Sequence, residues 1–412
     1  IGLYDLMASR SGNPLPRHKH LSRKEVRRRA PALAPHLYRG AVVYSDASVD
    51  DARYVVSAAR TAAGLGALVL TSTKVTGIVR TENRVSGVEV ECLETGNKFE
   101  ILCGTVVNAT GVWSGDIEEY AGGHGAKVRA SKGIHLLIPR NRIQLETGLI
   151  LRTSESVLFV IPWDQHWIVG TTDTDWDLDR AHPAASQKDI HYLLSTLNEV
   201  LNTPLHYNDI VGVYAGLRPL LTGESEKTSK LSREHAVSIS APGLVSISGG
   251  KYTTYRVMAA DTIDAVGIDQ NLDLPASKTA SVPLIGAVGY HQTRSDAEKL
   301  SRDTGLSLKV IDHLISRHGD RIGEILELIS VDPKLGEPLA SDHPYLRAEV
   351  VHAVRSEAAL HLEDVLTRRT RLSVETRDRG TESAREVAEL MAPELGWGEA
   401  TVINEVDHYL RR

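Results

Sequence analysis

Residues 244–256 read Leu-Val-Ser-Ile-Ser-Gly-Gly-Lys-Tyr-Thr-Thr-Tyr-Arg, an apolar segment that runs into a glycine pair. We predict a buried strand over 244–248 and a helix that opens at Gly249 and Gly250. The first turn of a helix presents backbone N–H groups and the positive end of the helix dipole, which favour a bound anion. Lys251 adds a cation, and Thr253 and Thr254 add hydroxyl groups. The stretch is predicted to hold a ligand; the alternative is a tight turn with a solvated lysine.

Upstream of this stretch, the hydrophobic pattern predicts a mixed α/β fold. A strand over 40–46, a helix capped by Ser48 and Asp51 that ends at Gly64, and an apolar strand over 67–71 indicate a βαβ unit on a parallel sheet. Alternating or buried strands then follow at 75–81, 85–93, 98–103 and 106–111, and the last of these leads into a turn and a helix near Trp113.

The pattern is mainly β between about 132 and 241, with one helix over about 187–201, and it changes beyond about 276. From there, helical patterns run to the C-terminus and are broken by glycine and proline residues. We therefore expect a separate α-helical domain at this end of the chain.

Composition narrows the functional classes. The 412 residues are 42% hydrophobic and 24% charged with a net charge of -6, which is typical of globular proteins and gives no global electrostatic basis for nucleic-acid binding. Two cysteines, Cys92 and Cys103, match neither a disulfide framework nor a zinc site, so we expect a reducing, cytoplasmic compartment and no metal. No apolar run approaches the length of a membrane span.

A local basic segment over residues 17–29 is the exception to this charge balance. Ser22 and Glu25 have the spacing of a capping box, and Pro31 follows soon after, so a solvated helix is the favoured interpretation. The alternative is a surface that lies against anionic lipid headgroups.

Three further residues are candidates for chemistry. His135 opens an apolar strand after Lys132 and Gly133, and imidazole takes up a proton near neutral pH. Arg218, next to Pro219, and Arg233 carry guanidinium groups, which suit carboxylate or phosphate recognition. Taken singly, each residue type is more often structural or solvated. The segment 170–173, Gly-Thr-Thr-Asp, follows a strand and by itself indicates a capped turn.

One expected motif of nucleotide-binding enzymes is missing from the sequence. No strand is followed by Gly-x-Gly-x-x-Gly and a helix, and the glycines at 122, 123 and 125 follow an acidic, helical segment instead. Local chemistry alone therefore indicates an α/β protein with an anion site.

The order of the motifs resembles the FAD-dependent, aerobic glycerol-3-phosphate dehydrogenases. The resemblance covers the whole chain and is carried by seven ordered segments and a helical end, which are 44–53, 107–113, 132–135, 161–163, 170–173, 216–220, 249–256 and 363–371. It implies a fold of the D-amino-acid-oxidase type: an FAD domain, a mixed-sheet substrate domain and a C-terminal all-α cap. The implied oxidoreductase domain covers 1–276, with FAD-binding parts at about 36–125 and 242–276 and a substrate part at about 126–241; the helical domain covers 277–412.

The family reaction oxidises sn-glycerol 3-phosphate to dihydroxyacetone phosphate with hydride transfer to FAD and onward transfer of electrons to quinone. By resemblance, His135 is the base for the C2 hydroxyl, Arg218 holds the developing alkoxide, and Arg233 and Lys251 bind the substrate phosphate. The residues expected to contact FAD are Val75, Ala109, Thr110, Gly111, Trp113, Gly249, Gly250, Lys251, Tyr252, Thr253 and Thr254. The family is also compatible with a homodimer and with peripheral contact at the inner face of the cell membrane.

The sequence departs from the family pattern at its start. The family begins with a dinucleotide-binding strand, glycine loop and helix, and this sequence starts after them, so we expect an N-terminally truncated FAD domain that lacks its first βαβ unit. Two alternatives stay open. One is a catalytically incomplete fragment. The other is a flavoenzyme of the same fold with different chemistry, either a glycerol-phosphate oxidase or an enzyme that oxidises amines or hydroxy acids.

Overall fold

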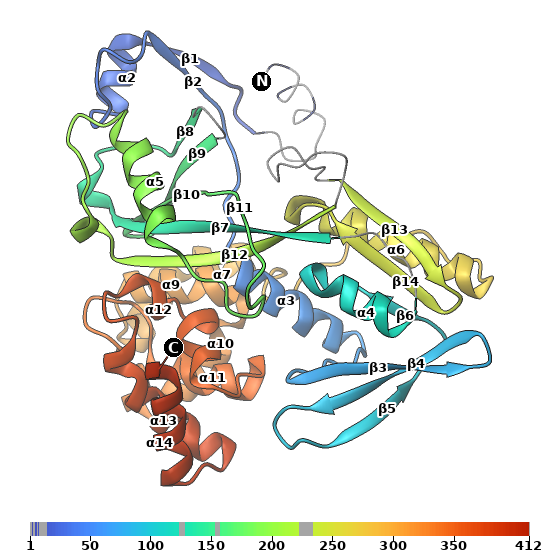
Figure 1. The fold of residues 1–412 in the computed structure, drawn as a ribbon. Helices are drawn as coiled ribbons and strands as arrows, with labels where there is room; N and C mark the ends of the chain where they lie inside the picture. The colour runs from blue at the N-terminus through green and yellow to red at the C-terminus, as the bar shows by residue number, and fades with distance from the viewer. Residues whose placement is uncertain are drawn as a thin grey trace. The chain divides into compact units, whose positions relative to one another are not determined.

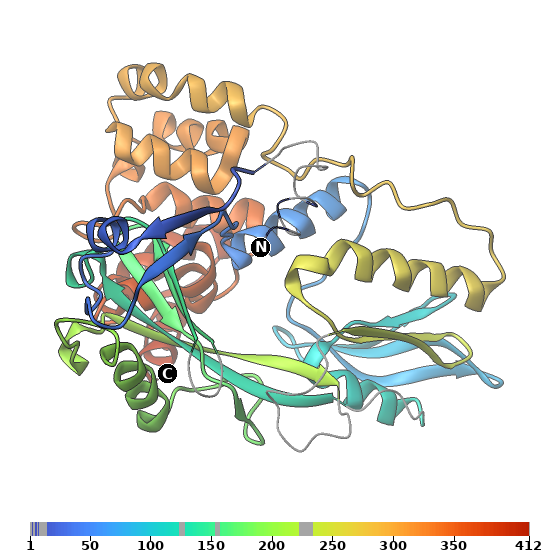
Figure 2. The same ribbon diagram turned by 90° about the horizontal axis from the view of Figure 1, so that it is seen from above.

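The chain divides into two compact units in the computed structural model, which describes residues 15–122, 128–152, 157–221 and 234–411 together with Gly2, Asp5 and Met7. Unit 1 comprises Ile1–Val26, Arg39–Val69 and Pro283–Arg412, and unit 2 comprises Arg27–Tyr38 and Leu70–Val282. Figures 1 and 2 show the helices of unit 1 in blue and orange to red, and the sheets of unit 2 in cyan to yellow.

The largest sheet of unit 2 is built around the long strand β7 (Val128–Pro139). It pairs along its length with β12 (Gly212–Leu221), and it also pairs with β10 (His166–Gly170) and the short β11 (Thr174–Asp175), all antiparallel. Outer strands β9 (Val157–Trp163) and β8 (Leu149–Arg152) extend the sheet beyond β10. In Figure 2, β7 and β12 run side by side as a long two-stranded ribbon.

The alternation of side chains along β7 explains its place in the core. Ile134, Leu136 and Ile138 fall on one face of the strand and are fully buried. They pack with Trp167 of β10 and with the apolar face of α5 (Gln187–Asn198), whose Leu193, Leu194 and Leu197 recur at helical spacing. A capping box between Ser186 and Asp189 begins α5, so the predicted helix at this position is confirmed.

Two three-stranded sheets complete unit 2. One is the antiparallel meander of β3 (Thr73–Thr81), β4 (Arg84–Cys92) and β5 (Lys98–Leu102). The other joins β13 (His235–Ala241) to β14 (Leu244–Gly249), which pairs in parallel with β6 (Val106–Asn108). Helix α4 (Ser114–Tyr120) packs its Ile117 against Val85 and Leu244, and α6 (Tyr255–Gln270) follows β14. The strands predicted from the apolar runs of this region are confirmed.

Three sequence predictions are wrong in detail. The apolar residues 67–71 form no strand, and Leu68 is 93% exposed, because no strand among the described residues pairs with their backbone. The predicted βαβ unit is therefore absent from the described chain, and β2 (Gly40–Val43) pairs antiparallel with β1 (Lys19–Ser22) instead. The helix α3 (Asp51–Gly64) is capped by Asp50, whose side chain accepts from the Arg53 backbone N–H, rather than by Ser48 and Asp51.

Unit 1 is mainly helical, as the C-terminal pattern predicts. Helix α13 (Thr381–Leu395) carries four fully buried residues at helical spacing in the core of unit 1: Ala384, Val387, Ala388 and Met391. The helices of its C-terminal part are α7 (Tyr290–Ser295), α8 (Ala297–Thr304), α9 (Leu308–His318), α10 (Ile322–Val331), α11 (Arg347–Glu357), α12 (Leu372–Glu375), α13 (Thr381–Leu395) and α14 (Glu399–Arg411).

The basic segment forms the predicted capped helix. Residues Arg23–Arg29 form α2, the Ser22 backbone N–H donates to the Glu25 carboxylate at 2.7 Å, and the Glu25 N–H donates to the Ser22 hydroxyl at 3.4 Å. Its basic side chains are mostly exposed, and Val26 is buried. Among the described residues, no helix has the length and apolar character needed to cross a bilayer.

A network of buried charges ties α3 to the C-terminal helices within unit 1. The Arg53 guanidinium donates to both Glu357 carboxylate oxygens, at 2.5 and 2.7 Å, and lies 3.3 Å from the His318 ring. A second set joins Arg317 and Arg371 to Asp50, at 3.2 and 2.5 Å. Breaking such a buried pair typically costs about 3–5 kcal/mol because the partner is left charged and unpaired. The motif around residue 50 thus has a structural role in unit 1.

The shifted pKa values of two groups in this network make the free energy of unfolding depend on pH. Burial is the main cause that lowers the pKa of His318 to about 4, and the nearby Arg53 adds to it; the pKa of Glu357 falls to about 2, because the Arg53 hydrogen bonds and charge outweigh burial, which would raise it. The folded state therefore binds fewer protons than the unfolded state as pH falls from about 6.5 to about 4, and unfolding becomes easier. For His318 this is worth roughly 3 kcal/mol.

We expect the melting temperature of unit 1 to fall as soon as the pH drops below about 6.5, rather than only in the range where carboxylates titrate. A His318→Gln variant should lose the upper part of this slope, whereas His182→Gln, at an exposed ion pair of unit 2, should keep it. Calorimetry across the pH range measures both. Identical slopes in wild type and His318→Gln would show that His318 does not carry the effect.

Candidate active site

One face of the β7–β12 ribbon gathers the predicted catalytic residues. The pairing register places Tyr214 opposite His135, Gly216 opposite Gly133, and Arg218 opposite Ser131. Directly opposed residues of an antiparallel pair share a face, so His135 and Arg218 point to the same side, away from the buried Ile134. Both are half-buried and so accessible to a ligand.

His135 is held between an aromatic ring and a glycine. Its imidazole stacks on the Tyr214 ring, with centroids 5.0 Å apart and planes inclined by 18°. On its other side β10 ends at Gly170, which is the register partner of His135. A Cβ at Gly170 would lie 2.9 Å from both Cγ and Nε2 of the imidazole. The position of the ring therefore depends on the missing side chain at residue 170.

The Arg218 guanidinium occupies the space next to a second glycine, Gly133. A Cβ at Gly133 would lie 2.7 Å from Nη1 of Arg218 and 2.6 Å from the Thr171 hydroxyl. The Arg218 guanidinium donates to the Thr171 hydroxyl at 2.9 Å and to the Thr172 carbonyl at 3.1 Å. The segment 170–173, interpreted from sequence as a capped turn, thus contacts a predicted catalytic residue.

Lys132, in the motif that contains His135, lies on the opposite face of β7. It is 5% exposed, and its ammonium donates to the Asp189 carboxylate at 2.7 Å and to the Ala184 carbonyl at 3.1 Å. It also lies 4.8 Å from the centre of the Trp176 ring. Burial would raise the pKa of Asp189, but hydrogen bonds from Lys132 and Ser186 lower it overall. Lys132 therefore holds β7 to the start of α5, on the face away from His135.

Two turns predicted to contact a cofactor lie at one edge of a sheet. Because β6 and β14 are parallel, their carboxyl ends point toward the same edge of the sheet, where β6 ends at Asn108 and β14 continues past Ser246 to Gly249. Such edges are the usual ligand sites of open α/β sheets. Asn108 is buried, and its side-chain carbonyl accepts from the Thr110 hydroxyl at 2.7 Å, while its amide donates to the Ser246 hydroxyl at 3.2 Å. This amide fixes the first turn to β14 and was missed in the sequence-based site.

The glycine pair takes a conformation that favours glycine. Gly249 and Gly250 have φ of 75° and 86°, and a Cβ at Gly249 would lie 2.6 Å from the Glu234 carbonyl oxygen. The prediction that the helix begins at the glycine pair is wrong, since α6 begins at Tyr255. Instead a 3₁₀ turn over Tyr252–Thr254 precedes α6, because the Lys251 carbonyl accepts from the Thr254 N–H at 3.1 Å. Lys251 and the two threonines are exposed beside this turn.

Strand β12 connects the two halves of the site. Beyond Arg218 it reaches Pro219, which lies 4.0 Å from the position of a Cβ on Gly111. Two residues further, the Leu221 side chain would lie 2.9 Å from a Cβ on Gly249. The ribbon that carries His135 and Arg218 therefore runs directly into both glycine turns. The residues of these two turns are the ones that would hold the expected FAD, which would supply the hydride acceptor.

The remaining predicted site residues have different surroundings. Trp113 ends the 3₁₀ turn Gly111–Trp113 and is 41% exposed next to the first turn. Val75 lies in β3, is half-buried, and packs against the apolar cluster around Leu244. Arg233 lies outside the described residues.

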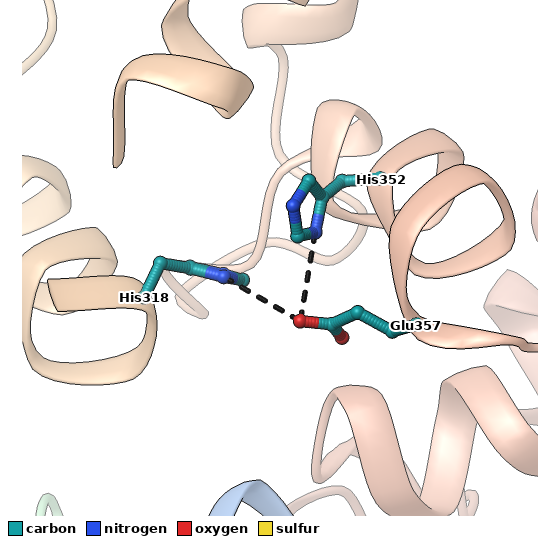
Figure 3. Close-up of side chains that lie close together, drawn as sticks. All are labelled: His318, His352 and Glu357. Carbon is teal, nitrogen blue, oxygen red and sulfur yellow. Dashed lines mark ion pairs between the residues drawn. The ribbon is translucent and has the colours of Figure 1, made fainter. Parts of the chain in front are cut away.

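A cluster in unit 1 has the composition of a metal site but not its electrostatics. His318, His352 and Glu357 are buried, and their potential ligand atoms lie within 4.8 Å of one another (Figure 3). The Glu357 oxygen nearest both rings also accepts from Arg53 at 2.7 Å and lies 3.7 Å from Arg60. A cation there would meet two guanidinium groups, so the three side chains belong to the buried charge network.

Two protein-family models match most of the chain. Residues 2–256 match the family described as FAD dependent oxidoreductase. Residues 277–402 match the family described as the C-terminal domain of alpha-glycerophosphate oxidase.

Individual relatives narrow the family. The chain is 49% identical over 413 residues to glycerol-3-phosphate dehydrogenase 2 of Mycobacterium tuberculosis (strain ATCC 25618 / H37Rv), covering 100% of this chain and 70% of that protein. It is 34% identical to the human mitochondrial glycerol-3-phosphate dehydrogenase, covering 96% of this chain and 56% of that protein. A solved structure, glycerol-3-phosphate dehydrogenase of Bacillus halodurans complexed with FAD, matches with a TM-score of 0.82 at 27% identity, over 95% of this chain and 78% of that one.

The glycine beside His135 yields a test of this geometry. A Gly170→Ala substitution places a methyl group against the imidazole, so the ring must shift by a fraction of an ångström or more. We expect kcat to fall by up to about 100-fold, the effect of a comparable misplacement of a catalytic group. Gly323→Ala in α10, where a Cβ meets nothing within 4 Å, is the control and should retain activity. Steady-state kinetics of both variants decide; full activity of Gly170→Ala would contradict the placement of His135.

Proposed function

Because this chain belongs to the FAD-dependent glycerol-3-phosphate dehydrogenase family, we propose that it oxidises sn-glycerol 3-phosphate to dihydroxyacetone phosphate and passes the electrons to quinone. One observation supports this most. His135 and Arg218 share a face of the β7–β12 ribbon, and the ribbon ends against the glycine turns at Gly111 and Gly249. The face proposed to bind the substrate hydroxyl, on β7 and β12, therefore lies next to the turns after β6 and β14 that are proposed to bind the cofactor.

The family membership confirms the predicted fold class. The FAD-bound relative and the two family matches agree with an FAD domain of the D-amino-acid-oxidase type, mixed sheets and a helical C-terminal domain. FAD is the cofactor, and when bound it supplies the hydride acceptor. The domain boundaries at 276 and 277 and the subdivision of the first domain stay a prediction.

The chemistry assigned to His135 is proton removal. Oxidation of a secondary alcohol requires that the hydroxyl lose its proton as the hydride leaves the carbon. A neutral imidazole within hydrogen-bond reach of that hydroxyl serves as the general base. The Tyr214 ring on one side and Gly170 on the other restrict the ring to one orientation. His135 therefore holds the proton while the substrate becomes a ketone.

Arg218 and Lys251 are assigned to two different charged parts of the substrate, the developing alkoxide and the phosphate. As the hydroxyl loses its proton, negative charge develops on the oxygen, and a preorganised guanidinium stabilises that charge more in the transition state than in the ground state. We assign Lys251, which is exposed just before the 3₁₀ turn that leads into α6, to the substrate phosphate, because it combines a cation with a nearby helix N-terminus. Arg233 is proposed as the second phosphate ligand by its place in the family motif.

The reaction itself is tested by reduction of the bound cofactor. We expect sn-glycerol 3-phosphate, added without oxygen, to bleach the flavin absorbance of the FAD-loaded protein, and glycerol, which lacks the phosphate, to leave it unchanged. A soluble quinone should then restore the colour faster than oxygen does. Flavin that stays yellow with glycerol 3-phosphate would contradict the substrate, and faster reoxidation by oxygen would favour the oxidase alternative.

The two residue roles predict opposite kinetic signatures. Lys251→Ala should raise KM for glycerol 3-phosphate by roughly 10- to 100-fold, because it removes a charge-assisted contact to a part of the substrate that does not react. His135→Ala should mainly lower kcat, by about 10²–10⁴-fold, because the general base acts only in the chemical step. Steady-state kinetics with a dye acceptor measure both. The reversed pattern would show that the roles are misassigned.

A further inference from the structure

The segment Thr171-Thr172-Asp173 follows β10 and contacts the Arg218 guanidinium. Its middle residue fixes it in place: Thr172 is 4% exposed, and its hydroxyl accepts from the Ile134 backbone N–H at 3.1 Å. After Asp173 the chain joins β7 again, through the pairing of Thr174 with Lys132. The segment is therefore anchored at both ends to the strand that carries His135.

Three groups of this segment surround the Arg218 guanidinium. Nη2 donates to the Thr171 hydroxyl at 2.9 Å, Nη1 donates to the Thr172 carbonyl at 3.1 Å, and Nη1 lies 4.0 Å from the Asp173 carboxylate. The Asp173 carboxylate is itself held by a hydrogen bond from the Ser131 hydroxyl. Ser131 is fully buried and lies opposite Arg218 in the ribbon.

The hydroxyl of Thr171 is itself oriented by its surroundings. It donates to the Thr172 carbonyl at 3.2 Å, so its lone pairs are directed toward the Arg218 guanidinium. The missing side chain of Gly133 leaves the space in which hydroxyl and guanidinium meet. The two terminal nitrogens of Arg218 are thus set by the turn before any substrate arrives.

Such an anchor matters because an arginine side chain is flexible. A free arginine loses rotamer entropy when it is fixed against a ligand, and a guanidinium that is already held loses less. Preorganised donors are also the ones that stabilise developing charge, because they need no reorganisation during the reaction.

We propose that Thr171, supported by Asp173, is a positioning residue that holds the Arg218 guanidinium for the oxidation step. The inference rests on the proposed function for the identity of that step, but the anchor itself does not. Thr171 acts through Arg218 and touches no reacting atom. The opposing interpretation is that 170–173 is only a structural turn.

Paired substitutions at Thr171 separate the two interpretations. Thr171→Val keeps the shape and removes the hydroxyl, and it should lower kcat by about 10- to 100-fold, the range for losing a hydrogen bond to a charged group, with little change in KM. Thr171→Ser restores the hydroxyl and should recover most of the activity. Thr174→Val, three residues along the same segment, is the control and should match wild type. A Thr171→Ser variant as poor as Thr171→Val, or a loss matched by an equal drop in melting temperature and flavin content, would overturn the proposal.

A double-mutant cycle tests whether Thr171 acts through Arg218. In an Arg218→Ala background, Thr171→Val should cause no further loss of kcat, because its target is gone. An equal fold-loss in both backgrounds would show that Thr171 acts independently and would overturn the proposal.

A measurement without turnover keeps this inference separate from the proposed function. Phenylglyoxal modifies accessible guanidinium groups, and peptide mass spectrometry reports the rate at Arg218. We expect Thr171→Val to be modified several-fold faster at Arg218 than wild type and Thr174→Val. Should wild-type protein fail to oxidise glycerol 3-phosphate, a faster rate would still establish the anchor. An unchanged rate would overturn it whatever the activity.

Discussion

The antiparallel pairing of β7 with β12 is the constraint on which the site depends. Its register sets Tyr214 against His135 and Arg218 against Ser131, and it carries Pro219 to the glycine turn at Gly111. A shift of one residue would turn every side chain of one strand to the other face and bury the charged groups. The fully buried Ile134, Leu136 and Ile138 oppose such a shift, because each would lose about 1.5–3 kcal/mol of burial on leaving the core. Packing on one face thereby fixes the chemistry on the other.

Glycines make room for chemistry on this ribbon. The space that a side chain would take at Gly133 is occupied by the Arg218 guanidinium, and at Gly170 by the His135 imidazole. At Gly249 it is occupied by a backbone carbonyl and Leu221. Glycine weakens a strand interior, since it packs no side chain and loses more entropy on folding. The neighbouring apolar residues and the buried Lys132–Asp189 pair hold β7 in place despite this cost. Because positions 133 and 170 carry no side chain, His135 and Arg218 can lie close to the backbone of the neighbouring strand.

Sequence patterns predict helices and strands correctly where residues close together in the chain determine the structure. Apolar segments located part of β7 and β14, the hydrophobic pattern located α5, and the spacing of Ser22 and Glu25 located the capped start of α2. Residues 67–71 misled because apolar character indicates a strand only if another strand pairs with it. Tyr214, Thr171 and Asp173 could not be placed at the site, because their proximity to His135 and Arg218 comes from register. The Arg53–Glu357 pair joins residues about three hundred positions apart, and no local signal reports such a contact.

We propose that the substrate binds on the face of the β7–β12 ribbon that carries Gly133, His135 and Arg218. A crystal structure of the FAD-loaded protein with sn-glycerol 3-phosphate tests it most directly. We expect the C2 hydroxyl oxygen within about 2.6–3.2 Å of both the His135 imidazole and the Arg218 guanidinium, with the phosphate toward Lys251. Glycerol 3-phosphate bound elsewhere, with His135 still stacked on Tyr214 and touching no substrate atom, would contradict it.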